Sequence, residues 1–90
     1  MYISGKMKGL DNYRTLFGLV EQQFQNEYRV MNPCRFEHTS DLWEDRILHD
    51  LNIIKSCDVV YMLNNWKDSN GAQTEHYFAQ GMGKKIIYQQ

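Results

Sequence analysis

The sequence predicts a small α/β domain with a doubly wound parallel sheet, in the order βαβαβαβ. Short apolar runs alternate along the chain with segments of helical period. One run, Asp58–Leu63, is apolar at every position after the first, which is typical of a central parallel strand covered on both faces. Right-handed crossovers between such strands give a doubly wound sheet. The 90 residues are enough for one domain, residues 1–90, and too few for two.

The first half of the chain supplies two predicted strands and one helix. Met1–Ser4 is a short apolar strand that ends at Gly5. Asp11 or Asn12 then caps a helix, and its apolar stripe has a period of 3.6 residues and consists of Tyr13, Leu16, Phe17, Val20 and Phe24. A second strand is predicted at Tyr28–Met31, stopped by the Asn32-Pro33 pair.

The second half continues the alternation. Ser40 or Asp41 is the expected cap of the next helix, where Asp41 and Glu44 resemble a capping box, and this helix runs to about Cys57. The best strand follows, then a polar loop, a third helix ended by Gly83, and a last strand; their ranges are Asp58–Leu63, Asn64–Gly71, Ala72–Met82 and Lys85–Tyr88. This order is flavodoxin-like or Rossmann-like. Such sheets bind ligands outside the carboxyl ends of their strands, so the expected site lies among loops 5–12, 32–40 and 64–71.

Composition excludes several classes of partner. The formal net charge is −1, with acids and bases interspersed, so no footprint for duplex nucleic acid or an anionic membrane is expected. No apolar run approaches the ~20 residues of a spanning helix. Cys34 and Cys57 belong to no metal-ligand spacing and suggest reduced thiols in a cytoplasm. A chain this short buries a modest core, which makes a homodimer or a higher homo-oligomer a natural expectation.

Three polar residues stand where the pattern favours apolar ones. Glu75 shares a stripe with Ala72 and Ala79, and this stripe is expected to face the sheet. A carboxylate there is costly without partners, although the amino end of the helix would favour its negative charge in the first turn. The alternative is that Glu75 points to water. Asp50 shares the face of the apolar residues of its helix and lies either at the border of that face or in a cleft. Tyr2 is either a core tyrosine or a hydroxyl donor to a carboxylate. Two carboxylates and a tyrosine suit chemistry at a sugar carbon, where a carboxylate attacks the anomeric centre.

The chain resembles the nucleoside 2-deoxyribosyltransferase-like superfamily, especially its small, uncharacterised phage and bacterial branch. It is also similar to the deoxynucleoside 5′-monophosphate N-glycosidases. Three segments across the chain carry the resemblance, namely Tyr2–Gly9, His49–Leu51 with Cys57–Val60 behind it, and Asp68–Glu75 continuing to Ala79 and Gly83–Lys85.

The resemblance implies a role for each matching residue. Glu75 matches the nucleophile that attacks C1′, Asp50 an aspartate that assists at the sugar and the departing base, and Tyr2 a tyrosine that orients the nucleophile. The resemblance also implies binding of the 5′ end of the substrate by Ser69 and the Gly5–Gly9 loop, and the expected binding residues are therefore Gly5, Lys6, Met7, Gly9, Ser69, Asn70 and Gly71. A loop leading into a helix amino end suits a phosphate on general grounds, and Lys6 and Lys8 add positive charge. The implied mechanism needs no metal and no cofactor.

Two departures from the family pattern keep a second function open. Relatives commonly have proline where Lys6 stands, and many have glycine where this chain has Tyr77, whose bulk would narrow the site or pack at a subunit contact. The leading hypothesis is an enzyme acting on a deoxynucleoside or its monophosphate. The alternatives are a non-catalytic nucleotide-binding module and an interaction subunit with a vestigial pocket. Trp66 either stacks on a base or packs in the interior.

Overall fold

The chain folds around a sheet of three parallel strands, in a computed structural model that describes all 90 residues. The strands are β1 (Tyr2–Ser4), β2 (Val59–Met62) and β3 (Lys85–Tyr88), in the spatial order β1-β2-β3. Every residue of β2 is buried, as expected for the central strand of a parallel sheet. The continuous apolar run therefore correctly predicted this strand, and the last strand was predicted at the bounds that the structure gives.

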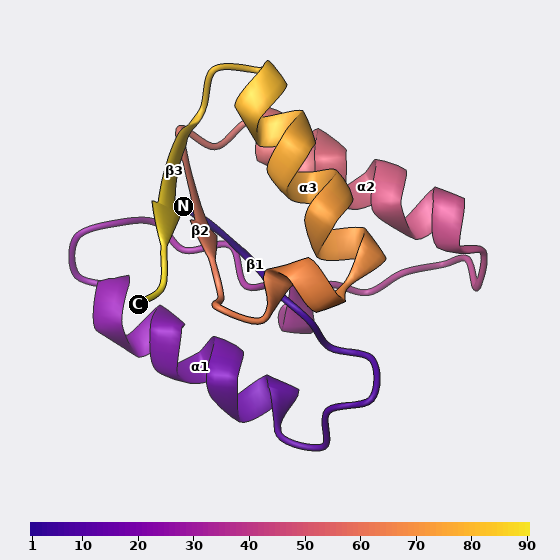
Figure 1. Cartoon of the computed structure of the whole chain (residues 1–90), viewed down its shortest axis with the longest axis horizontal. Coiled ribbons are helices and arrows are strands. Elements are labelled where there is room, and N and C mark those ends of the chain that lie inside the picture. The colour runs from indigo at the N-terminus through magenta and orange to yellow at the C-terminus, as the bar shows by residue number, and fades with distance from the viewer.

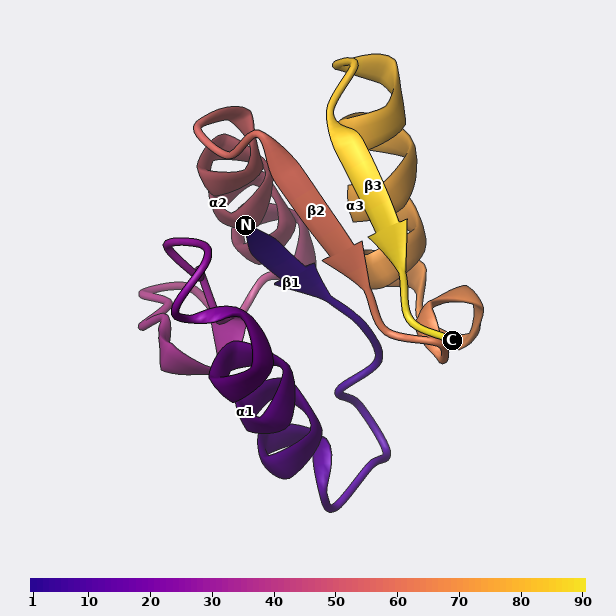
Figure 2. The ribbon, with the colours of Figure 1, turned by 90° about the vertical axis from the view of Figure 1, so that its left-hand side faces the viewer.

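Three helices cover the two faces of the sheet (Figures 1 and 2). Helix α1 (Tyr13–Phe24) lies on one face, and α2 (Trp43–Lys55) and α3 (Asn70–Gly81) lie together on the other. Two short 3₁₀ turns, η1 (Pro33–Arg35) and η2 (Trp66–Asp68), precede α2 and α3 in the chain. The molecule is thus a small, compact α/β domain.

The alternation of side chains along the strands divides the core in two. Tyr2 of β1 joins Val60 and Met62 of β2 under α2 and α3, where Ile54 and Ala79 complete the packing. The opposite face is packed against α1 by a second set of buried residues, which includes Ile3, Phe17, Val20, Tyr61 and Leu63. Successive residues of one strand therefore belong to different cores.

The predicted strand Tyr28–Met31 does not form. The residues after α1 continue to turn, because Tyr28 donates its backbone N–H to the Phe24 carbonyl oxygen at 2.9 Å. At the other end Asn32 caps η1, accepting at Oδ1 from the Cys34 N–H at 3.0 Å. Arg29 and Met31 lie beside the first residues of the chain, because Met1 donates its amino group to the Arg29 carbonyl oxygen at 2.8 Å. Met31 forms a single parallel bridge with Tyr2. The apolar pattern was real, but turns at both ends leave too few residues for a strand.

The starts of two helices also differ from the prediction. Helix α2 begins at Trp43 after Leu42, which has no capping side chain, so the capping box at Asp41 is wrong. Ser40 instead accepts from the Leu42 N–H at 3.1 Å and donates to Asp45 at 2.7 Å. Helix α3 begins at Asn70, two residues earlier than predicted, because the Ser69 hydroxyl accepts from the Ala72 N–H at 3.1 Å.

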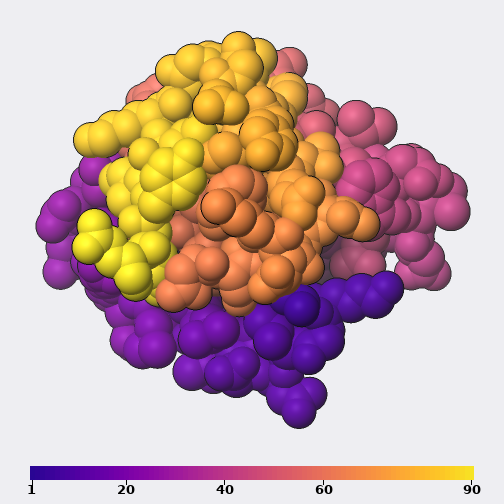
Figure 3. Space-filling view, viewed as in Figure 1, coloured from indigo at the N-terminus to yellow at the C-terminus, as the bar shows by residue number.

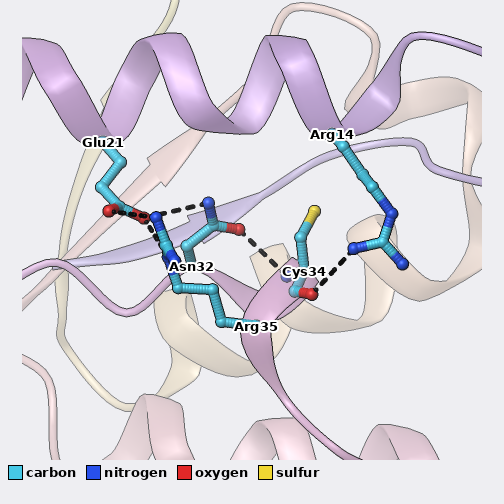
Figure 4. Close-up of polar contacts among 5 residues, drawn as sticks. All are labelled: Arg14, Glu21, Asn32, Cys34 and Arg35. Carbon is cyan, nitrogen blue, oxygen red and sulfur yellow. Dashed lines mark hydrogen bonds and ion pairs between the residues drawn. The ribbon is translucent and has the colours of Figure 1, made fainter.

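A polar network fixes η1 against α1 (Figure 4). Glu21 of α1 accepts hydrogen bonds from Asn32 at 3.1 Å and from two nitrogens of Arg35, each at 2.9 Å. Arg14, also on α1, donates to the Cys34 carbonyl oxygen at 3.1 Å. The network holds the short turn, and the loop that follows it, in a defined place beside the sheet.

Candidate functional site

Glu75 is a carboxyl group buried between α3 and the sheet. It shares a stripe of α3 with Ala72 and Ala79, which are 2% and 0% exposed, and Glu75 itself is 6% exposed. The small side chains of Ala72 and Ala79 let α3 approach the sheet closely, and Glu75, which lies between them in the stripe, is therefore buried. The prediction that this stripe faces the sheet is confirmed, and the water-facing alternative is wrong. Because α3 begins at Asn70, Glu75 lies beyond the first turn, where the helix dipole helps less.

Two hydroxyl groups of β1 hold this carboxyl group. The Tyr2 hydroxyl donates to Glu75 Oε2 at 2.8 Å, and Ser4 Oγ donates to Glu75 Oε1 at 2.6 Å. Residues two apart on a strand share a face, so both side chains point to α3 from β1. Ser4 is the last residue of β1, which places the group at the carboxyl edge of the sheet.

Burial dominates the acid–base properties of the group. Burial raises the pKa of Glu75 to about 8; the nearby charge of Asp50 adds to this rise, whereas the hydrogen bond from Ser4 opposes it. The pKa of Tyr2 is raised well above its usual value, first by burial and then by the negative charge of Glu75. Tyr2 is therefore a permanent hydrogen-bond donor, and Glu75 is poised to gain or lose a proton near neutral pH.

Asp50 reaches the same region from α2. Its side chain is 15% exposed, and its Oδ1 atom lies 3.2 Å from His38 Nε2 and 3.3 Å from His49 Nδ1. The negative charge of Asp50 lies near enough to help raise the pKa of Glu75. Of the two predicted positions for Asp50, the structure places it in the cleft.

One cleft of about 1100 Å³ opens over these groups. All ten residues predicted for the site line it; besides Glu75, Asp50 and Tyr2 they are Gly5, Lys6, Met7, Gly9, Ser69, Asn70 and Gly71. Figure 3 shows the indigo amino-terminal loop lying against the orange segment that leads into α3. Near its start, Gly5 passes so close to Leu63 that an added Cβ would lie 2.5 Å from Leu63 Cδ1.

Several residues of this region were missed in the sequence. Ser4 follows Tyr2 by two places on a strand, so the strand period was a signal that pointed to it. His38 and Phe36 enter the cleft from the loop after η1, and Arg14, Arg46 and Trp43 line it from α1 and α2. No spacing in the sequence distinguishes these residues from ordinary loop and helix-surface residues.

Trp66 and Tyr77 do not line the main cleft. Trp66 is 8% exposed and stacks on His76 with ring centroids 4.1 Å apart, so it packs in the interior. Tyr77 is exposed and, with Trp43, borders a separate depression of about 490 Å³ on the outer side of α2 and α3. Its bulk therefore leaves the main cleft open.

No helix of the protein combines the length and apolarity needed to cross a membrane.

The fold and the site define a class of protein, namely a small α/β domain with a buried carboxyl group at the carboxyl edge of its parallel sheet. Within that class, the chain belongs to the family described as Domain of unknown function (DUF4406), which it matches over residues 1–88. No curated protein and no solved structure shows a significant match to the chain.

Proposed function

We propose that the domain cleaves or exchanges the N-glycosidic bond of a deoxynucleoside or a deoxynucleoside 5′-monophosphate, with Glu75 as nucleophile. The observation that carries this proposal is the fixed, buried carboxyl group that lines a cleft with room for a nucleotide. Hydrogen bonds of 2.8 Å from Tyr2 and 2.6 Å from Ser4 orient it. A structural glutamate needs no opening to a cleft, whereas Glu75 and Asp50 both line one.

The reaction proceeds in two displacements. A Glu75 oxygen attacks C1′, the bond from C1′ to the base nitrogen breaks, and its electron pair leaves with the base, which takes a proton from Asp50. A glycosyl ester then links C1′ to Glu75. Water, or a second base, attacks C1′ next; the ester bond breaks and returns the carboxylate, and the proton of the attacking group passes to Asp50. Negative charge beside C1′ stabilises the oxocarbenium-like transition state.

A single proton serves both carboxyl groups. Because burial raises the pKa of Glu75 to about 8, Glu75 has to lose its proton before it attacks. The charge of Asp50 acts on Glu75, and we assign Asp50 as the acceptor of this proton. Transfer from Glu75 to Asp50 therefore creates the nucleophile and the general acid in one step.

We place the 5′ end of the substrate at the part of the cleft where α3 begins. The amino end of α3 begins here, and Ser69, Asn70 and Gly71 line the cleft at that point. Helix amino ends favour anions, and Lys6 and Lys8 contribute positive charge from the amino-terminal loop. These groups support a substrate that carries a 5′-phosphate.

We also propose that the sheet is a reduced version of a doubly wound sheet. A doubly wound order would place residues 28–31 beside β1, on the edge away from β2. The bridge between Met31 and Tyr2 lies on that edge, which supports a reduced version of the Rossmann-like arrangement. The switch point of such a sheet lies between β1 and β2, next to Ser4.

Replacement of Glu75 tests the proposed function. Incubation of the protein with the common deoxynucleosides and their 5′-monophosphates, followed by chromatography, should detect free base. In Glu75→Gln the release should fall by at least about a thousandfold, because the nucleophile is lost. Glu27→Gln, a change at an exposed glutamate, is the matched control and should keep the full rate.

The outcome also separates the competing functions. A full rate in Glu75→Gln would remove this residue from the chemistry. Nucleotide binding without base release would favour the non-catalytic nucleotide-binding module. Binding is measured by thermal shift, because a ligand that binds only the native state raises the melting temperature.

A further inference from the structure

Three potential metal ligands converge beside the cleft, and two of them, His38 and Asp50, line it. His38 comes from the loop between η1 and α2, and His49 and Asp50 are neighbours in α2. Asp50 Oδ1 lies 3.2 Å from His38 Nε2 and 3.3 Å from His49 Nδ1. All three ligand atoms lie within 4.8 Å of one another. Both histidines therefore present a ring nitrogen to the same carboxylate oxygen.

The separations suit a shared ion better than a strong hydrogen-bond pair. Ligand atoms bound to one tetrahedral zinc ion at ~2.0–2.1 Å lie about 3.4 Å from one another. The two contacts of 3.2 and 3.3 Å are close to that value. Hydrogen bonds from a charged imidazole to a carboxylate are shorter, about 2.7–2.9 Å. Only the two histidine nitrogens need to move closer together for all three atoms to reach one ion.

The charge balance around Asp50 favours a cation. Asp50 forms no ion pair with a lysine or an arginine, and its negative charge already helps to raise the pKa of Glu75. The Asp50 side chain is 15% exposed, so water compensates its negative charge only in part. A carboxylate with so little solvent requires a positive partner, and a cation shared with the two histidines would supply one.

We propose that His38 Nε2, His49 Nδ1 and Asp50 Oδ1 bind one divalent transition-metal ion of the zinc type. Two imidazoles and one carboxylate suit zinc and its neighbours rather than magnesium or calcium, which prefer oxygen ligands. Three protein ligands leave a fourth position free. His38 and Asp50 line the cleft, so that position borders it.

The inference goes beyond the proposed function and does not depend on it. The proposed reaction needs the Asp50 carboxyl group to take up and release a proton. An ion bound to Asp50 Oδ1 would block that role, so metal binding would inhibit base release. A binding measurement therefore decides the metal site whether or not the protein cleaves a nucleoside.

The test is a titration of the chelator-stripped full chain with zinc chloride in a calorimeter. We expect one ion per chain and a rise in the melting temperature. Cobalt chloride should give the visible absorption of a four-coordinate site. His38→Gln, His49→Gln and Asp50→Asn should each weaken zinc binding by at least about tenfold, since even loss of an outer-shell partner costs about that much.

Two controls keep the result decisive. Thermal unfolding in chelator shows whether each variant keeps the native fold, and only folded variants are compared. Cys34→Ser removes the half-buried thiol that lines the same cleft, and it should leave zinc affinity unchanged. The proposal is overturned by the absence of saturable binding, by wild-type affinity in any one of the three ligand variants, or by loss of binding in Cys34→Ser.

Discussion

The two hydroxyl groups that donate to Glu75 fix its direction and limit the rise of its pKa. Each donates to a different carboxylate oxygen, at 2.8 Å from Tyr2 and 2.6 Å from Ser4. These hydrogen bonds favour the ionised form and so act against burial, which raises the pKa of Glu75 to about 8. Removal of one donor should therefore leave a carboxyl group that is both less fixed and harder to ionise.

Tyr2→Phe tests this role at the scale of one atom. A hydrogen bond to a charged group is worth roughly 1.5–3 kcal/mol, so base release should slow by roughly ten- to a hundredfold at neutral pH, and the rate is measured well below the melting temperature of the variant. Tyr61→Phe is the matched control, because Tyr61 is also buried on a strand but packs in the core on the opposite face of the sheet. Equal rates in the two variants would contradict an orienting role for Tyr2.

Two glycines of similar appearance in the sequence should respond in opposite ways to alanine. In Gly5→Ala the new Cβ would lie 2.5 Å from Leu63 Cδ1, so the chain has to shift, at a cost of about 1–3 kcal/mol in unfolding free energy. In Gly18→Ala, within α1, nothing lies within 4 Å, and helix propensity should add up to about 1 kcal/mol. Denaturant unfolding of both variants checks the signs; a stable Gly5→Ala would show that the exit of β1 is looser than described.

Sequence reasoning located residues by their contrast with a pattern. Glu75 was visible because an acid interrupts a stripe of alanines, and Tyr2 because it stands in the first strand. Ser4 produces no contrast of its own, since a serine at a strand end is ordinary, and only its spacing of two residues from Tyr2 pointed to it. His38 lies in a loop, where residue spacing does not determine direction, so its approach to Asp50 depends on packing that only the fold defines.

His76 links two elements, α3 and β3. Its Nε2 lies 2.7 Å from the Tyr88 hydroxyl, its Nδ1 is buried with no hydrogen-bond partner, and its ring stacks on Trp66. Burial lowers the pKa of His76, and the charge of Lys67 lowers it further. The interior at this junction therefore favours a neutral imidazole.

Acid should loosen the junction between α3 and β3. Because the folded-state pKa of His76 lies below the unfolded value of ~6.5, the unfolded chain takes up this proton first. The stability that neutral His76 contributes is thus complete above that value and is lost as the pH falls through the lower, folded-state pKa. NMR titration of the three histidines should place His76 below ~6.5, and a value at or above it would refute this account. Part of the acid-induced loss of stability should disappear in His76→Phe, which keeps an aromatic ring and cannot titrate.

At the scale of elements, the sequence predicted a helix or a strand correctly where its pattern extended over many residues. The run at 58–63 and the helical stripe of α1 each extend over enough residues to define one structure. The segment at 28–31 has strand-like residues, but a helix end and a prolyl turn leave it room for one bridge. Local propensity was correct there, and the flanking turns overrode it.

At the scale of the whole molecule, the site depends on both halves of the chain. Tyr2 and Ser4 come from the first strand, Asp50 from the middle helix and Glu75 from the last one, so no part of the chain holds the constellation alone. Parallel strands bring these distant segments to one edge because their carboxyl ends point the same way. The α/β class therefore predicted which edge carries the site, while its depth and its histidines required the packed fold.

The outer side of β3 has a different consequence. No strand lies beyond it, so its outward backbone groups are free to recruit a foreign strand and begin aggregation. Its shortness and an exposed lysine at its first residue, Lys85, are the defences that natural proteins commonly use at such a border. Any orderly pairing of two copies is therefore expected to join helical surfaces, and loss of that lysine should make the protein less soluble rather than dimeric.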